Sequence, residues 1–361
     1  MQDLLGFPSG CCSTPNVSKM SPENVSALGN DTLGVLPSSS SLKWLNSTLG
    51  CIGFVGIGGN LLVCIVFLKI RKLRTLTNYL IVHQAAIDLI TSILLVLYYL
   101  GPQFVYTADS VAGEILCRLW KSAYLLWTCF LASSFNLVVI TFERYYAIIY
   151  PLHHATMFTN TRVAIILAAE WLVAAIFKSF NIYTQHFDRG HCKAAKMWVS
   201  AEFGNFVGVS NVFAQYLVPL AVMSVAYARC IIALSQKSLT DVAVVNSQDR
   251  EAAQRDNSMK RASNNVLRML VIVFVAYALC WGIPQLTFLA FCLGVSVDFG
   301  GVFYNVGVVI GFLNTSINPF IYALKYRQFQ RGVRMVFCSK CLNEVGDIES
   351  FANDSFSNPR S

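Results

Sequence analysis

Charged residues are scarce in this chain. Only 13% of its 361 residues are Asp, Glu, Lys or Arg, against roughly 25% in a soluble domain. Hydrophobic residues make up 55%, and they fall in long runs, such as LGCIGFVGIGGNLLVCIVFL (49–68), whose one strongly polar side chain is Asn60. About 20 apolar residues in a helix cross a bilayer core about 30 Å thick. The composition therefore excludes an ordinary soluble protein and predicts a membrane protein.

The chain also lacks the patterns of an enzyme or a transporter. The run GFVGIGG (53–59) lies inside an apolar stretch, where small residues favour close helix packing rather than phosphate binding. A seven-span metal hydrolase would gather several His and Asp ligands at one membrane face, whereas the five histidines are divided between a span and opposite faces (His83, His153, His154, His186 and His191). A transporter would show repeated halves with paired interrupted helices, and no such repeat is present. We expect no enzymatic activity.

Seven apolar segments follow one another along the chain. They lie near 46–69, 76–100, 116–147, 163–183, 203–235, 264–293 and 300–324. Their length predicts helices and excludes a barrel of ten-residue alternating strands. The third, fifth and sixth are longer than a span needs, so we expect them to tilt or to project from the membrane. The predicted fold is an all-α membrane protein, a seven-transmembrane helix bundle over residues 45–325.

Basic residues give the orientation. Four of them lie in the loop after the first span (69–74) and five follow the seventh span (325–340), whereas the first 44 residues hold only Lys19 and Lys43. Basic loops stay in the cytoplasm, so an odd number of spans places the N-terminus outside. The net charge of +8 is then a topology signal, and a nucleic-acid partner is not expected because the basic residues are shared among separate loops.

The N-terminal tail, residues 1–44, is predicted to be extracellular and disordered. It is rich in Ser, Asn and Gly and lacks the apolar core of a signal peptide. Four Asn-x-Ser/Thr sequons lie in or just beyond it, at Asn16, Asn24, Asn30 and Asn46. Several sequons in a segment placed outside by charge predict glycosylation.

Each span carries a short motif around one polar or ring residue. The motifs are GGNLLV, AAID, FERYYAIIYPL, AEW, Pro219 with Tyr227, CWGIP and NTSINPFIY, in chain order. With these seven motifs in this order, residues 45–341 resemble a rhodopsin-like (class A) G-protein-coupled receptor, nearest in character to the peptide receptors. The resemblance implies a multi-pass plasma-membrane receptor that binds an extracellular ligand and activates heterotrimeric G proteins. Arrestins and receptor kinases are further partners that it implies.

The resemblance assigns a switch to the acid–Arg–Tyr triplet at the end of the third span. Glu143 would hold Arg144 at rest in a charge-assisted pair, and the freed Arg144 would face a G protein. The residues implied in this switch and in coupling are Glu143, Arg144, Tyr145, Pro151, Leu152, Tyr227, Trp281, Pro284, Asn318, Pro319 and Tyr322. Pro151 and Leu152 would form a knob in the second intracellular loop. The alternative is that Glu143 and Arg144 only mark the helix end.

The family pattern also implies an ion site and a disulfide. Asp88, an acid inside a span and hence a functional-site candidate, would face Ser133, Asn314 and Asn318 around an allosteric sodium ion; no other metal or cofactor is expected. The alternative is a protonated or water-bridged Asp88 that braces the helices. Cys117 would pair with Cys192 in an oxidising environment. For Cys11 and Cys12 the sequence leaves the pairing open.

Three features depart from the family pattern. CWGIP has two residues between Trp281 and Pro284 instead of one, so either a helix bulge keeps Trp281 under the ligand pocket or Gly282 takes its place. Cys117 lies 27 residues before Arg144, slightly more than usual, which predicts a bulge or a register shift in the upper third helix. The sixth helix starts around Asn264 without an acid. We therefore expect Glu143 to restrain Arg144 alone and the receptor to have basal activity.

Two absences narrow the ligand. The stretch AYLLWTCFLA (123–132) holds no acid, unlike amine receptors, and 300–324 holds no lysine, unlike opsins. The predicted pocket is uncharged and aromatic: Trp127, Phe130, Asn211, Gln215, Gln285, Phe288 and Tyr304. The loop above it adds Arg189, Lys193 and Lys196 opposite Glu202. A peptide with aromatic or amidated ends suits this set best, and a lipid or another uncharged small molecule is the alternative.

Residues 326–337 (YRQFQRGVRMVF) place aromatic and basic residues on opposite faces of a helix, which predicts a short eighth helix lying on the inner leaflet. Cys338 and Cys341 follow as sites of palmitoylation or as free thiols, and 338–361 form a cytoplasmic tail. Two minor hypotheses remain, a zinc site in HFDRGHC (His186, Asp188, His191) and a polar partner or proton-sensing role for Glu170. Ser263, Ser355 and Ser357 are candidate phosphorylation sites.

Overall fold

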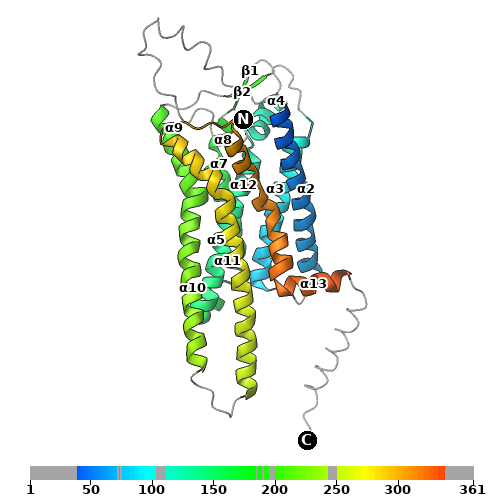
Figure 1. The fold of residues 1–361 in the computed structure, drawn as a ribbon, viewed down its shortest axis with the longest axis vertical. Helices are drawn as coiled ribbons and strands as arrows, with labels where there is room; N and C mark the ends of the chain where they lie inside the picture. The colour runs from blue at the N-terminus through cyan, green and yellow to red at the C-terminus, as the bar shows by residue number, and fades with distance from the viewer. Residues whose placement is uncertain are drawn as a thin grey trace.

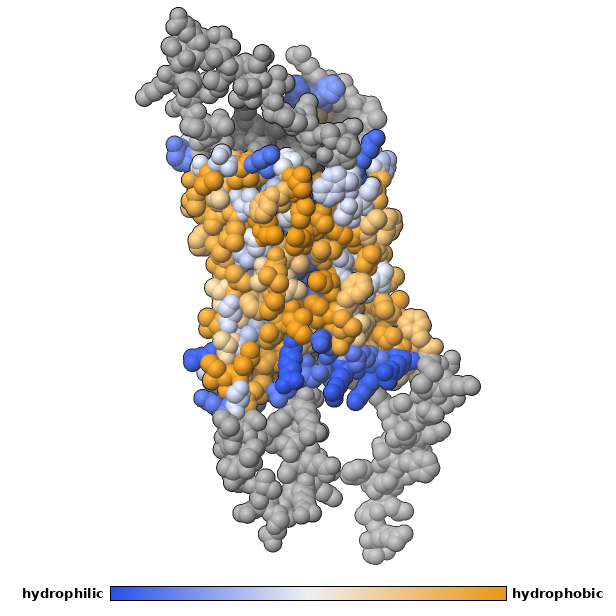
Figure 2. All heavy atoms as spheres, in the orientation of Figure 1, coloured by the Kyte–Doolittle hydropathy of each residue, from blue (hydrophilic) through white to orange (hydrophobic). Residues whose placement is uncertain are grey.

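The computed structural model describes residues 39–70, 73, 75–102, 111–183, 185–188, 191–194, 200–242 and 250–337. Within these residues, seven helical segments are long and apolar enough to cross a membrane. They pack side by side as a bundle (Figure 1). A belt of hydrophobic residues surrounds its middle on the visible face, and hydrophilic residues gather at its lower edge (Figure 2). The predicted seven-helix membrane bundle is confirmed.

Four spans lie close to their predicted limits. They are α2 (Ser39–Lys69), α3 (Leu76–Leu100), α7 (Asn160–Lys178) continued by α8 (Phe180–Tyr183), and α12 (Val302–Lys325). Thr75 and Thr159 cap α3 and α7, each accepting a hydrogen bond from the backbone N–H three residues on. α2 begins before the predicted end of the tail at residue 44, and Leu45 and Leu49, one turn apart, are buried in the bundle.

The two ends of the bundle carry different elements. At one end, β1 (Gln185–Asp188) and β2 (His191–Ala194) form an antiparallel pair in which Phe187 lies opposite Cys192. At the other end, α13 (Arg327–Phe337) runs across the bundle (Figure 1). We call these two ends of the bundle the hairpin end and the α13 end. Each span has one terminus at either end.

α13 is attached to the bundle through aromatic and amide side chains. Phe329 is buried with its ring 5.9 Å from that of Phe67, and the Tyr326 hydroxyl donates to Asn78 Oδ1 over 2.5 Å. Phe337 is exposed. The helix occupies nearly the predicted range, with Tyr326 as the link to α12; its contact with a membrane surface stays a prediction.

The third span is bulged near the hairpin end, as its spacing predicts. α4 (Val111–Ile115) passes into a π-helical turn, η4 (Leu116–Lys121), before α5 (Tyr124–Ile149). Between them, Ala123 has φ 53°, a left-handed conformation that costs a non-glycine residue about 1–2 kcal/mol. The Ser122 hydroxyl, which accepts from the Tyr124 N–H at 3.2 Å, stabilises this break.

The fifth and sixth spans project from the α13 end. The fifth consists of α9 (Ala201–Val212), the π-helical η5 (Phe213–Leu217) and α10 (Val218–Val242). The sixth, α11 (Arg250–Cys292), has 43 residues and is about 65 Å long at 1.5 Å per residue. The polar stretch 236–263 between the fifth and sixth apolar runs is therefore helical, except for 243–249, which lie outside the described residues. Good helix formers such as REAAQR continue the helix beyond the apolar run.

Small residues bring the first helix close to its neighbours. A methyl group on Gly56 would meet the Ser92 side chain of α3 inside contact distance, so the GFVGIGG run serves packing, as its setting indicates. Asn60, fully buried, donates from Nδ2 to the Thr315 carbonyl of α12 over 2.8 Å. α2 is thus fixed to α3 by close approach and to α12 by a hydrogen bond.

Candidate functional site

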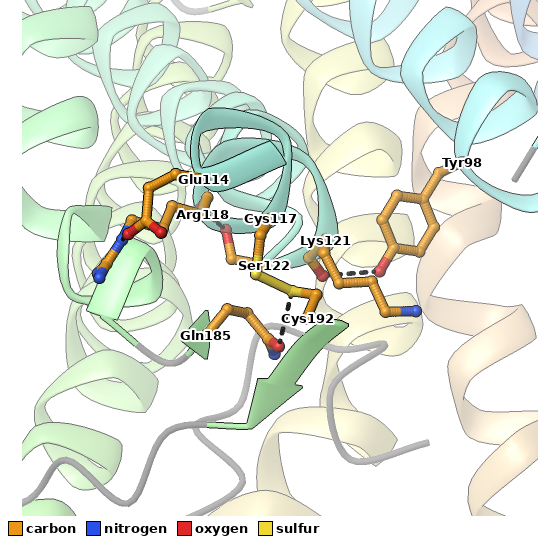
Figure 3. Close-up of a disulfide and its surroundings, with 8 residues drawn as sticks. All are labelled: Tyr98, Glu114, Cys117, Arg118, Lys121, Ser122, Gln185 and Cys192. Carbon is orange, nitrogen blue, oxygen red and sulfur yellow. Dashed lines mark hydrogen bonds and ion pairs between the residues drawn. A yellow bond between two sulfur atoms is a disulfide. The ribbon is translucent and has the colours of Figure 1, made fainter. Parts of the chain in front are cut away.

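The predicted disulfide joins the third span to the hairpin (Figure 3). Cys117 on η4 and Cys192 on β2 are bonded, with their Cα atoms 5.5 Å apart. Glu114 and Arg118 form an ion pair one turn apart beside it, and the Tyr98 hydroxyl of α3 donates to the Lys121 carbonyl over 3.1 Å. The pairing implied by the family resemblance is confirmed, and it holds the hairpin over the end of the bundle.

Within the hairpin, Asp188 faces a lysine. Its Oδ2 accepts from Lys193 Nζ over 2.8 Å, and this ammonium lowers the pKa of the Asp188 carboxyl. His191 lies opposite Asp188 in the strand register. The carboxylate that a zinc ion would need is already paired, and the described part of the chain holds no group of three His, Cys, Asp or Glu placed for a metal.

An aromatic cluster lies below the hairpin between α5, α11 and α12. The Trp281 ring is 5.0 Å from Phe130 and 6.4 Å from Trp127, and Phe130 is 5.2 Å from Phe312. α11 is α-helical through this region, and Gly282 points toward the Tyr216 hydroxyl. Trp281 therefore keeps the place beneath the predicted pocket without a π-helical bulge, and Gly282 does not occupy it.

The predicted pocket is not uncharged. Lys178, at the end of α7, is 1% exposed, and its Nζ donates to Asn211 Oδ1 and to Gln215 Oε1, each over 2.5 Å. The ammonium also lies 5.6 Å from the centre of the Trp127 ring, within cation–π range. The prediction of an uncharged pocket was wrong because it overlooked this lysine. A single lysine inside an apolar span was the signal that could have identified it.

The other predicted pocket residues lie on α11 and α12. Gln285, Phe288 and Tyr304 are all buried. Tyr304 packs edge-to-face on Phe299, with ring centres 4.8 Å apart. Among the described residues, both polar atoms of the Gln285 side chain and the Tyr304 hydroxyl have no hydrogen-bond partner. These groups are unused hydrogen-bonding capacity next to the aromatic cluster.

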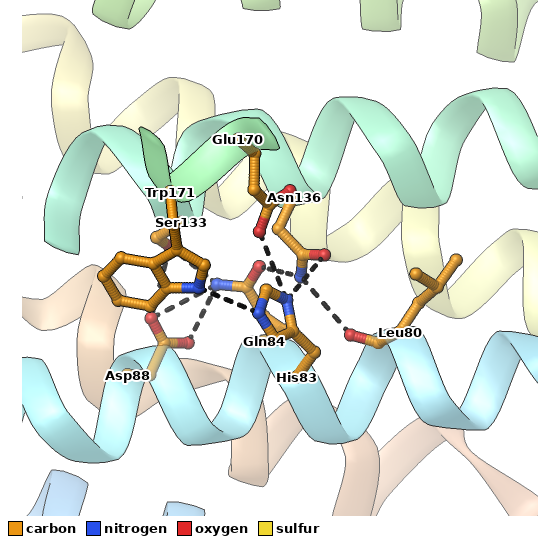
Figure 4. Close-up of polar contacts among 8 residues, drawn as sticks. All are labelled: Leu80, His83, Gln84, Asp88, Ser133, Asn136, Glu170 and Trp171. Atoms are coloured by element: carbon orange, nitrogen blue, oxygen red, sulfur yellow. Dashed lines mark hydrogen bonds and ion pairs between the residues drawn. The ribbon is translucent and has the colours of Figure 1, made fainter. Parts of the chain in front are cut away.

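Asp88 is the centre of a buried polar cluster between α3, α5 and α12 (Figure 4). Its carboxylate accepts from Ser133 Oγ over 3.2 Å and from Asn318 Nδ2 over 2.9 Å. Gln84, one turn earlier on α3, donates from Nε2 to both carboxylate oxygens, over 3.2 and 3.1 Å. No hydrogen bond joins Asn314 to this cluster within the described residues. Gln84 was not among the predicted residues, although its spacing of four residues from Asp88 on one helix places the two side chains together.

This donor set does not fit a sodium ion. A cation needs oxygen ligands, but the Gln84 and Asn318 amides present N–H groups to Asp88, and Gln84 Nε2 also lies 2.6 Å from Ser133 Oγ. The carbonyl oxygen of Gln84 accepts from Asn136 Nδ2 over 2.8 Å instead. Asn318 Oδ1 is an acceptor without a partner among the described residues. The Gln84 and Asn318 amides satisfy the Asp88 carboxylate through hydrogen bonds instead.

Glu170 lies beside His83, although neither of its carboxylate oxygens has a hydrogen-bond partner among the described residues. Its Oε1 lies 3.3 Å from His83 Nδ1, and the neighbouring Trp171 donates from Nε1 to His83 Nε2 over 3.1 Å. His83 Nδ1 is also 3.2 Å from Asn136 Oδ1. Figure 4 shows this chain of contacts reaching from α7 to the Asp88 cluster. It joins the fourth span to the second and third.

At the α13 end, Glu143 and Arg144 form the expected ion pair. The guanidinium donates to both carboxylate oxygens of Glu143, which is 0% exposed. Among the described residues, Arg144 has no other ion-pair partner, so Glu143 restrains it alone, as expected. Two further groups hold Glu143 itself. Thr77 Oγ1 donates to the carboxylate over 3.3 Å, and His154 Nε2 lies 3.0 Å from Oε1. His154 comes from α6 (Pro151–Met157), so the acid that restrains Arg144 is itself fixed by the second and third spans and by α6.

Some of the remaining switch residues lie at this end of the bundle, and others lie nearer its middle. Tyr227 accepts from Thr141 Oγ1 over 3.0 Å, Tyr322 is buried, and Tyr145 packs its ring on Tyr146 at 5.9 Å. Leu152 on α6 is 86% exposed. The structure also places Pro284 within α11 and Pro319 within α12. Glu143, Arg144, Tyr227 and Tyr322 are thus buried or half-buried at one end of the bundle, and Leu152 projects from it.

Several predicted modification sites lie outside the described residues. They are Asn16, Asn24, Asn30, Cys11, Cys12, Cys338, Cys341, Ser355 and Ser357. Asn46 is described and lies half-buried on the second turn of α2. Ser263 lies within α11 rather than in a loop. Glycosylation, lipidation and phosphorylation stay predictions.

Comparison with known proteins gives one consistent result. Residues 59–322 match the family model described as "7 transmembrane receptor (rhodopsin family)". The neuromedin-U receptor 2 of Homo sapiens is 30% identical over 308 residues, which cover 79% of this chain and 69% of that protein. The somatostatin receptor type 5 of Bos taurus is 26% identical (92% and 86% covered), and the histamine H2 receptor of Homo sapiens is 24% identical (85% and 83% covered).

Proposed function

The chain belongs to the rhodopsin family of seven-transmembrane receptors, and on this premise we propose that it binds an extracellular peptide and activates heterotrimeric G proteins. The family consists of signalling receptors, not enzymes, and its members are multi-pass proteins of the plasma membrane. The hairpin end would face outward and the α13 end the cytoplasm, in agreement with the basic residues near α13. Two of the similar proteins are named for the peptides neuromedin U and somatostatin, which favours a peptide over an amine.

The observation that carries this proposal is the buried Glu143–Arg144 pair at the α13 end. A buried charge that loses its partner is strongly destabilised, so Arg144 can leave Glu143 only when another partner becomes accessible. An outward movement of α11 would open the α13 end and let Arg144 face a G protein. Tyr227 and Tyr322, buried beside it, would hold that arrangement, and the exposed Leu152 would insert into the partner.

The ligand signal would reach this pair through the packed core. Trp281 is in contact with Phe130, and Phe130 lies in turn on Phe312 of α12. A ligand that presses on Trp127 or Trp281 would displace α11 relative to α5. Pro284 in α11 and Pro319 in α12 interrupt the helical hydrogen bonds, so bending would concentrate there.

The first test is ligand-free nucleotide exchange on a panel of G-protein α subunits. Wild type and Arg144→Ala are compared at matched surface expression, with Arg118→Ala, at the hairpin end, as the matched control. We expect exchange above background in wild type and in the control and its loss in Arg144→Ala. Exchange that persists in Arg144→Ala would contradict the assigned switch. The subunit that responds would then serve in a screen of peptides, with lipids as the competing ligand class.

A further inference from the structure

We propose that the pocket at the hairpin end binds an anionic group of the ligand, a carboxylate or a sulfonate-like anion, through Lys178. This inference rests on the proposed receptor function and names the chemistry that the ligand must carry. It contradicts the expectation of an amidated or uncharged ligand end. Among the described residues, Lys178 is a buried cation without an acidic partner.

Lys178 is held by neutral groups alone. Its two hydrogen-bond acceptors are the side-chain carbonyls of Asn211 and Gln215, four residues apart on the fifth span. In the part of the chain that the structure describes, no Asp or Glu forms an ion pair with it. A buried ammonium without a counter-charge costs several kcal/mol. In the free receptor, the positive charge of Lys178 is therefore not compensated.

The acidic residues of the bundle are engaged elsewhere. Asp88 accepts from Gln84 and Asn318, Glu143 from Arg144, and Glu170 lies on His83. Glu202, at the start of α9, is exposed. A counter-ion for Lys178 would therefore come from outside the described chain, and an intramembrane cation of this kind is by default a functional-site candidate.

Unused donors lie on the same side of the bundle. Gln215 Nε2 has no acceptor, although its carbonyl oxygen binds Lys178. Gln285, fully buried and also without partners, lies one turn beyond Trp281 on the same face of α11. Trp281 is next to Trp127, over which the ammonium sits. The site would thus offer one cation and two amide N–H groups, a set that matches the lone pairs of an anion.

The aromatic residues define what can be attached to this anion. Trp127, Phe130 and Trp281 pack against one another below the ammonium, so an apolar or aromatic group would be adjacent to the charge. A free C-terminal carboxylate on an aromatic residue of a peptide combines both features. A fatty acid carries the same carboxylate on an aliphatic chain, and the two sources can be separated experimentally.

The test measures the charge preference of the pocket without any known agonist. Gln215→Cys introduces a thiol beside Lys178, and its modification rate is measured with two impermeant methanethiosulfonate reagents, one with a sulfonate and one with a trimethylammonium group. Rates are divided by those for free cysteine, and wild type gives the background from the other cysteines of the chain, such as the exposed Cys51. The same rates are measured after adding Lys178→Met, and after adding Lys121→Met, which removes an exposed lysine at the same end.

We expect the sulfonate reagent to react about tenfold faster than the cationic one, since a single charge at this range acts strongly in a medium of low dielectric constant. Lys178→Met should abolish this preference, whereas Lys121→Met should preserve it. Equal normalised rates in the presence of Lys178, or no reaction of the introduced thiol with either reagent, would overturn the proposal. The readout needs no G protein, so it can fail while the exchange assay succeeds, and the reverse.

Protection experiments then identify the source of the anion. Slower modification by the free acid of acetyl-Trp-Phe, with no effect of its amide, would support a peptide carboxylate. Slower modification by dodecanoate alone would support the anion site with a lipid ligand. Equal protection by the acid and the amide of the dipeptide would show that the charge is not recognised, and would count against the role of Lys178.

Discussion

The side-chain amide of Gln84 donates to both carboxylate oxygens of Asp88, from one turn earlier on the same helix. The amide satisfies the acid in the position where the family resemblance implies a sodium ion. We therefore predict that the wild-type receptor stimulates nucleotide exchange equally in sodium chloride and in choline chloride. Both salts are used at about 150 mM, a physiological ionic strength.

Gln84→Leu should create sodium sensitivity. Leucine removes the two N–H contacts and leaves a buried carboxylate with free oxygen lone pairs, which costs about 1–3 kcal/mol in thermal stability. Sodium should restore part of that loss and lower basal exchange in the variant. Gln328→Leu, at the α13 end, is the control. A sodium response already present in wild type would contradict this interpretation of Gln84.

His154→Phe should raise basal exchange. The ring of His154 stacks on Phe158 at 5.5 Å, and phenylalanine keeps this contact while removing the group that lies on Glu143. Losing one hydrogen bond of about 1 kcal/mol favours release of Arg144 by roughly fivefold. The exposed neighbour variant His153→Phe should have no effect. Unchanged exchange in both variants would mean that Thr77 and Arg144 satisfy Glu143 without His154.

Two glycines on α2 provide a matched pair. Gly56→Ala places a methyl group against Ser92, whose hydroxyl donates to the Asp88 carbonyl, so we expect a loss of about 1–3 kcal/mol. Gly58→Ala meets nothing within 4 Å, and the better helix propensity of alanine predicts a gain of up to about 1 kcal/mol. Thermal unfolding in detergent measures both. Equal losses would show that the two positions differ less than their surroundings indicate.

Loss of either cysteine of the disulfide should lower the stability as much as loss of both. The bond closes a loop with a sequence separation of 75 residues, for which loop entropy gives about 4 kcal/mol as an upper value. Cys117→Ser and Cys192→Ser should lower the midpoint of thermal unfolding equally, and the double variant should match either single variant. An additional loss in the double variant would mean that one cysteine has a second role.

The limits of the spans could be predicted because about 20 consecutive apolar residues are a strong signal. The bulge near Ala123 could also be predicted, because the number of residues between Cys117 and Arg144 exceeds the usual number in the family. The length of α11 could not be predicted. Its polar residues beyond the apolar run are helical, and hydropathy alone does not distinguish a polar helix from a loop.

Two of the missed site residues, Lys178 and His154, depend on contacts that a local sequence pattern does not show. Lys178 stands between Phe177 and Ser179 at the end of an apolar run, where a lysine usually marks the membrane interface; only the phase of α7 turns it onto Asn211. His154 reaches Glu143 because α6 folds back, a tertiary contact without a local signal. Gln84 was different, since its spacing from Asp88 already placed the two side chains on one helix face.

The π-helical turn at Leu116–Lys121 and the left-handed Ala123 also affect how other receptors can serve as templates for this one. An extra residue in the third span rotates every later position by about 100° around the helix axis. Alignment by counting forward from Cys117 would turn Trp127 and Phe130 away from the pocket. Counting backward from Arg144 preserves their facing, so ligand docking by homology should be anchored at the arginine.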